Sequence, residues 1–99
     1  MREANPARGE AAWDGLRLRP SFAALVAAEE ELGPLFALVE RAADGGLRLS
    51  ELAALFWHCL DPRPEGLSRA DFSERLAEHG LAAATPALRV LLGQILKGR

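Results

Sequence analysis

Apolar residues recur every three or four positions along most of the chain, which is the spacing of one face of a helix. Five such segments follow one another, each bounded by capping residues, glycine or proline. We expect helices over 21–32 and 34–43, a third capped by Ser50 and ended by Asp61-Pro62, a fourth from Ser68 to Gly80, and a fifth that begins at Thr85-Pro86.

A short segment of different character precedes these helices. Trp13, Leu16 and Leu18 surround Asp14-Gly15, a dipeptide suited to the positive φ angles of a tight hairpin turn. Two such strands are only marginally stable alone, so we expect them to lie on the helices with Trp13 as the anchor. Residues 1–9 lack periodicity and are expected to form a flexible tail before a single helical domain over 10–99. The predicted fold is mainly α: about five short helices in a compact bundle with a small N-terminal β-hairpin.

The composition narrows the classes of function. Hydrophobic residues make up 49% of the 99 residues, charged residues 26%, and the formal net charge is −2, as in an ordered water-soluble chain. This balance supplies no general field for nucleic acid or an anionic membrane. No apolar stretch is long enough to span a bilayer, and Cys59 has no second cysteine to pair with. We therefore expect a cytoplasmic protein without nucleic-acid or membrane partners.

Candidate chemistry is sparse. Adjacent residues on a helix diverge by about 100°, so His58 is not placed to activate Cys59, which lies on the apolar stripe. These residues and His79 have no metal-ligand spacing. A calcium loop that started at Asp61 would place an arginine and a phenylalanine at its third and twelfth positions, where oxygen ligands belong. We expect no enzyme, no cofactor and no metal.

Glu29 is the first residue that stands out. It lies two helical turns after Phe22, in the middle of the apolar stripe of the first predicted helix. An unpaired carboxylate there would cost several kcal/mol by desolvation, so we expect a buried charge paired with Arg8, Arg19 or backbone N–H groups.

Two further residues lie off the apolar stripes of their helices. Trp57 is about 140° from the line of Leu52, and Val90 lies almost opposite the seam of the last helix. Exposed apolar side chains of this kind are candidates for partner binding. The alternative is that they pack beneath the hairpin or the long loop, and the sequence leaves both interpretations open.

The order of segments resembles the small gene transfer agent tail proteins, which are related to phage tail assembly chaperones. The resemblance covers nearly the whole chain and is carried by three segments: Asn5-Pro6-Ala7-Arg8-Gly9-Glu10, Leu18-Arg19-Pro20-Ser21-Phe22-Ala23-Ala24-Leu25, and Gly80-Leu81 followed by Thr85-Pro86-Ala87-Leu88. The strand-like run of the family after its arginine, glycine and glutamate is here the short Ala11-Ala12-Trp13.

This resemblance implies a non-enzymatic role in building the tail of a phage, prophage or bacterial gene transfer agent. The implied partners are the tape measure protein, which such a chaperone coats, and the tail tube protein, whose subunits later replace the chaperone. One alternative is a structural tail component retained in the particle. A second is a metal-free helical interaction module of EF-hand-like type, and a homo-oligomer stays open.

Overall fold

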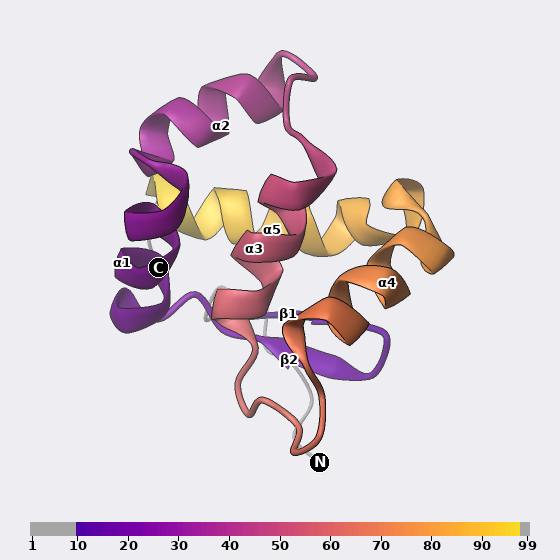
Figure 1. Ribbon diagram of the computed structural model, residues 1–99. Coiled ribbons are helices and arrows are strands. Elements are labelled where there is room, and N and C mark those ends of the chain that lie inside the picture. Colours follow the sequence, from indigo (N-terminus) through magenta and orange to yellow (C-terminus); the bar gives the residue numbers. More distant parts are fainter. Residues whose placement is uncertain (1–9, 98–99) are drawn as a thin grey trace.

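The computed structural model describes residues 10–97 as a short hairpin followed by helices (Figure 1). The predicted mainly helical fold is confirmed, whereas the tail expected over residues 1–9 lies outside the described part of the chain. The elements are β1 (Ala11–Trp13), β2 (Leu16–Leu18), α1 (Phe22–Leu32), α2 (Leu35–Ala43), α3 (Leu49–Cys59), α4 (Arg69–His79) and α5 (Leu81–Lys97).

The hairpin forms as the sequence predicts. Asp14 and Gly15 have φ angles of 51° and 75°, the left-handed values that a two-residue turn of this kind requires. The free side of β2 is paired with the backbone at the end of α3, where Leu18 forms a bridge with Leu60 and Arg19 N donates to the Cys59 carbonyl at 2.7 Å. Asp61 N donates in turn to the Arg17 carbonyl at 3.1 Å. The ribbon is thereby attached to the end of α3.

Two helices begin at the serine caps that the sequence predicts. Ser21 Oγ accepts a hydrogen bond from Ala24 N at 3.2 Å, and Ser68 Oγ accepts one from Asp71 N at 3.0 Å. Each serine thereby satisfies one of the N–H groups that have no partner within the helix. α4 ends at Gly80, whose φ of 86° favours glycine.

Two other helix starts differ from the prediction. α3 has Arg48 as its N-cap instead of Ser50, because Glu51 Oε1 accepts from Arg48 N at 3.0 Å and closes the first turn there. α5 begins at Leu81, so that Thr85-Pro86 lies inside the helix. Alanine favours helix strongly, and the fully buried Ala84 holds this first turn against the core.

α1 presents a different face to the core from the one predicted. Its buried residue is Ala28, with Ala24 and Leu25 partly buried beside it, while Phe22 is 85% exposed. Alanine has almost no side chain, so this face lets α1 approach α3 closely. Among the larger apolar residues of α1, Leu25 and Leu32 still pack against the core from partly buried positions, whereas Phe22 lies at the surface.

The core lies where α3 meets its neighbours. α3 packs against α1 and α4, and α5 packs against β1 and α4, crossing behind α3 in Figure 1. Trp13 is 5% exposed and makes edge-to-face ring contacts with Phe72 and Phe56, at centroid distances of 5.5 and 6.5 Å. It is the hairpin's anchor in this core. The largest fully buried side chains are Phe56, Phe72, Leu18, Leu38, Leu55, Leu76, Leu91 and Cys59.

Candidate partner-binding site

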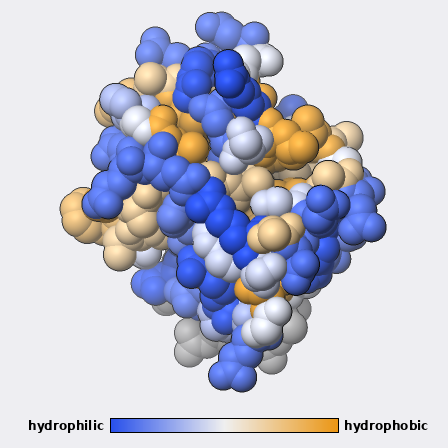
Figure 2. Space-filling model, viewed as in Figure 1, coloured by the Kyte–Doolittle hydropathy of each residue, from blue (hydrophilic) through white to orange (hydrophobic). Residues whose placement is uncertain are grey.

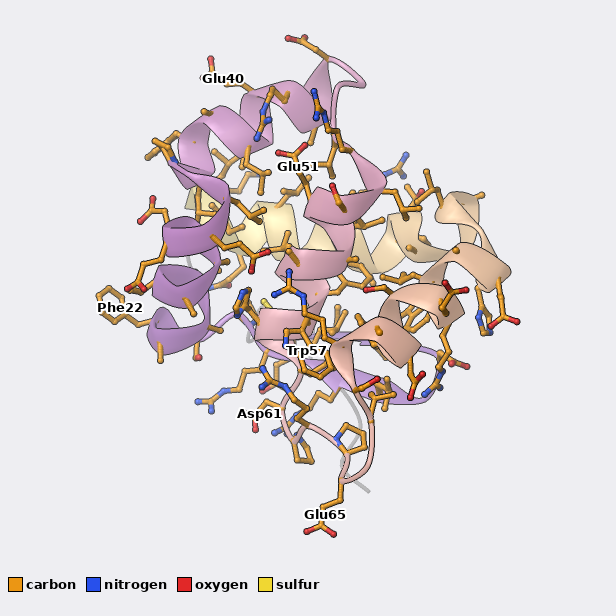
Figure 3. The ribbon with its side chains drawn as sticks, in the orientation of Figure 1. Phe22, Glu40, Glu51, Trp57, Asp61 and Glu65 are labelled. Atoms are coloured by element: carbon orange, nitrogen blue, oxygen red, sulfur yellow. The ribbon has the colours of Figure 1, made fainter. Side chains whose placement is uncertain are left out.

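Trp57 lies on α3 beside the loop that leads to α4 and is half-buried (Figure 3). Its ring packs against that of Phe72 at a centroid distance of 5.9 Å. The Arg63 guanidinium lies over the indole, 4.3 Å from its centroid, and Arg63 Nη2 donates to the Trp57 carbonyl at 3.1 Å. A cation over an aromatic face attracts it electrostatically. Arg63 thus shields part of the surface that the sequence offers for partner binding.

Val90 is also half-buried and packs against the core cluster. Like Trp57, it has some exposed surface and some packing surface. A binding role for these two residues stays a prediction.

Glu29 is exposed, so the buried position expected for it is wrong. The reason is the rotation of α1, which buries Ala28 fully and leaves Phe22 and Glu29 exposed. Glu29 Oε2 accepts from Leu35 N at 3.1 Å. That contact supplies a cap for the start of α2, since Pro34 at the N-cap makes no side-chain hydrogen bond.

Of the partners expected for Glu29, a backbone N–H group is observed, that of Leu35, and Arg19 is not. Arg19 pairs instead with Asp61, Nη1 to Oδ2, at 3.3 Å. Arg8 lies outside the described residues.

Glu31 is the carboxylate that ties helices together. Its Oε1 accepts from Arg69 Nη1 and contacts His58 Nε2, each at 2.9 Å, and its Oε2 accepts from the second Arg69 nitrogen. The hydrogen bonds from Arg69, and then that from His58, lower the pKa of Glu31 to about 2. Sequence reasoning missed this contact between α1, α3 and α4. The feature of the sequence that points to this contact is a carboxylate at a helix C-terminus, where the helix dipole disfavours negative charge and a cationic partner is expected.

The hairpin turn is held by a second charged contact. Asp14 Oδ2 accepts from Arg75 Nε at 3.0 Å, and Asp14 Oδ1 lies 3.5 Å from His79 Nε2. The His79 ring also lies 5.2 Å from that of Trp13. Both charged contacts hold elements of the fold together.

Catalytic and metal chemistry find no support in the described residues. Burial raises the pKa of the Cys59 thiol to about 12, which makes the nucleophilic thiolate inaccessible at neutral pH. Residues 10–97 contain no group of three or more His, Cys, Asp or Glu side chains that could hold a metal ion. Nor is any helix among them long and apolar enough to cross a membrane.

Among the described residues, the most exposed large apolar side chains are two aromatics that the sequence analysis did not single out. Phe22, at the start of α1, is 85% exposed, and Phe36, in the first turn of α2, is 72% exposed. Phe22 projects outward from the edge of the molecule in Figure 3, and the same edge is coloured hydrophobic in Figure 2. The sequence pattern had placed Phe22 in the core stripe.

Each of these phenylalanines is followed along its helix by a carboxylate on the same side. Phe22, Val26 and Glu30 are spaced four residues apart, so each step turns the helix by only about 40°, and Phe36 and Glu40 have the same spacing. Glu30 and Glu40 are exposed, and neither takes part in the ion pairs found within residues 10–97. We call this set of five residues the acidic aromatic face.

A second apolar surface lies between the α2–α3 turn and the starts of α3 and α5. It is an open pocket of about 130 Å³. Two of its lining residues, Leu49 and Leu81, are 42% and 51% exposed. Hydrophobic side chains gather beside this turn in Figure 2. The other lining residues are Gly45, Leu47, Arg48, Leu52, Thr85 and Leu88.

The described residues form a small helical fold with exposed apolar surfaces, which is the kind of surface that marks candidate protein-binding sites. Residues 8–98 match the family described as Phage tail tube protein, GTA-gp10, and the chain belongs to that family. This confirms the resemblance to gene transfer agent and phage tail proteins, a family of structural tail proteins and not of enzymes. Neither a curated protein nor a solved structure gives a significant match.

Proposed function

We propose that the protein is a tail assembly chaperone that binds the tape measure protein until tail tube subunits replace it. Membership of the tail family supports a role in tail assembly. The exposure of Phe22 and Phe36 is the observation that carries the proposal. Burying a phenylalanine side chain contributes roughly 1.5–3 kcal/mol. Two such side chains on adjacent helices therefore give a useful binding surface for an apolar partner segment.

The size of this surface suits a chaperone that must later leave. A few anchor residues commonly carry most of the binding free energy of an interface. Two aromatic anchors at the surface of a small domain bind more weakly than a large obligate interface. Tube subunits that bury more apolar area on the tape measure protein can then displace the chaperone.

Co-expression with the tape measure protein tests this proposal. We expect the wild type to co-purify with its partner, and the double variant Phe22→Ser/Phe36→Ser to lose it while its helical circular dichroism is kept. Leu81→Ser is the control, because Leu81 is another exposed apolar helix residue, at 51% exposure, at the start of α5 and away from α1 and α2 in Figure 1. Equal co-purification of all three proteins would reject the face.

The same assay separates this face from the one that the sequence predicts. Trp57→Ala and Val90→Ala alter residues of α3 and α5, apart from α1 and α2. Loss of the tape measure protein in these variants, with folding intact and the phenylalanine variant unaffected, would assign binding to Trp57 and Val90 instead.

A second candidate function is a structural tail component that stays in the particle. The description of the family as a tail tube protein favours this alternative. Purified particles distinguish the two functions. A chaperone is abundant in the assembling lysate and depleted from finished tails, whereas a structural subunit is present in finished tails in a fixed ratio to the other tail proteins.

A further inference from the structure

We infer that the acidic aromatic face binds a basic amphipathic helix, in which an apolar row is flanked by lysine or arginine. This inference rests on the proposed function, because it takes α1 and α2 as the binding surface. It adds the chemistry of the partner segment.

α1 and α2 carry an excess of negative charge. The two helices contain four glutamates and a single basic residue, Arg41. Glu31 is engaged by Arg69 and His58, Glu29 caps α2, and Arg41 pairs with Glu51 at 2.6 Å. Glu30 and Glu40 remain exposed, eight residues after Phe22 and four residues after Phe36 along their helices, without an ion pair to the rest of the described chain.

Glu30 occupies an unfavourable position for a carboxylate. It lies in the last turn of α1, which contains no basic residue, and negative charge there is unfavourable for the helix dipole. Glu31 offsets that cost through its hydrogen bonds with Arg69, whereas Glu30 makes no such contact among the described residues. A local preference broken without a compensating contact is expected at functional positions.

The exposed carboxylates of this face also disfavour a second copy of this chain as the binding partner. In a two-fold dimer the same patch meets itself, which would bring Glu30 and Glu40 toward the carboxylates of the other copy. Like charges placed opposite each other in an interface disfavour association. A lysine or arginine four residues from an apolar anchor matches the Phe36–Glu40 spacing instead.

Two synthetic amphipathic helices with the same leucine row, one flanked by lysine and the other by glutamate, serve as probes. We expect the full-length protein to bind the lysine helix and not the glutamate helix. Glu30→Gln/Glu40→Gln should weaken this binding about two- to tenfold at low salt, and the difference should largely vanish near 0.5 M NaCl, where exposed charges are screened. The matched control is Glu74→Gln/Glu78→Gln, which removes the same charge from exposed positions on α4.

The outcomes separate this inference from the proposed function. Failure of the lysine helix to bind, equal binding of both helices, or equal losses in the two glutamine variants would each overturn it. If Phe22→Ser/Phe36→Ser still releases the tape measure protein in any of those cases, the proposed function stands and only the basic partner is rejected. If the phenylalanine variant keeps the tape measure protein, the face itself fails, and the inference fails with it.

Discussion

At the scale of single residues, Glu31 connects three helices through one carboxylate. Its partners come from α3 and α4, and neither lies near it in the sequence. The pKa of Glu31 is about 2 in the folded protein, below the ordinary value of 4.5, so folding favours the ionised form. The stabilisation is therefore complete above about pH 4.5 and is lost as the pH falls toward 2.

Glu31→Gln should lower the free energy of unfolding at pH 7 by about 1 kcal/mol or less, because exposed ion pairs are screened by solvent. The side chains of Glu31 and Arg69 are 37% and 42% exposed. Urea unfolding at pH 7 and near pH 2.5 measures the effect, and the difference between variant and wild type should shrink at the lower pH. Glu30→Gln is the neighbouring control, and a pH-independent deficit in Glu31→Gln would contradict the ion-pair explanation.

Cys59 gives a second prediction at the residue scale. The thiol is buried, and desolvation raises its pKa to about 12. In the native state the thiol is therefore protonated at neutral pH and inaccessible to a thiol reagent. Labelling at pH 8 should be slow in native buffer and rapid in denaturant. Fast stoichiometric labelling of the native protein would show that this part of the core opens readily.

At the scale of elements, the hairpin depends on one aromatic anchor. Trp13→Ala should cost about 3–5 kcal/mol, because it removes a buried indole from between Phe56 and Phe72. Trp57→Ala makes the same chemical change at a half-buried position and should cost roughly 0.5–3 kcal/mol. Thermal unfolding of both variants checks the order, and the reverse order would place the anchor on α3.

Proline inside α5 offers a stabilising substitution. Pro86 is the sixth residue of the helix, is exposed, and has no N–H to donate to the Ala82 carbonyl. Pro86→Ala restores that donor, while the more flexible unfolded chain offsets part of the gain. We expect a net increase of about 1–2 kcal/mol in the free energy of unfolding, measured by urea denaturation. A decrease would mean that the proline ring itself is needed at this position.

The helix starts show which features of an element the sequence determines. Ser21 and Ser68 are predicted because a cap is a local contact, closed within three residues. The starts of α3 and α5 depend on contacts that compete with the predicted caps. At α3 this contact is the hydrogen bond to the Glu51 carboxylate, and at α5 it is the burial of Ala84. In both cases the capping preference would apply to the isolated segment. In the folded chain, contacts of a neighbouring residue move the start of the helix.

The candidate site was harder to predict than the fold for a related reason. Periodicity orders residues around a helix, but it does not say which face meets the core when alanines can line the contact. On α1 the small Ala24 and Ala28 face inward and Phe22 faces outward. Trp57 could be recognised as lying off its stripe, but Arg63, which covers it, comes from a loop whose path no helical pattern describes.

At the scale of the whole molecule, the fold has the dimensions of a packed domain. The radius of gyration is 12.3 Å, and about 13 Å is typical of a compact domain of this length. Within residues 10–97, fully buried side chains come from β2, α1, α2, α3, α4 and α5. The core joins all of these elements, so we expect it to be stable without an added ion.

Calcium tests this expectation and the EF-hand-like alternative together. Two of the carboxylates near the turns that precede α3 and α4 are already engaged: Glu51 with Arg41 and with Arg48 N, and Asp61 with Arg17 and Arg19. An ion at 100 times its dissociation constant would add about 2.7 kcal/mol to the native state, which for a chain of this size raises the melting temperature by roughly 10–20 °C. We expect melting curves in millimolar calcium and in chelator to coincide, with magnesium as the control for non-specific ionic effects. A chelator-sensitive drop of several degrees, absent with magnesium, would mean that these turns bind calcium after all.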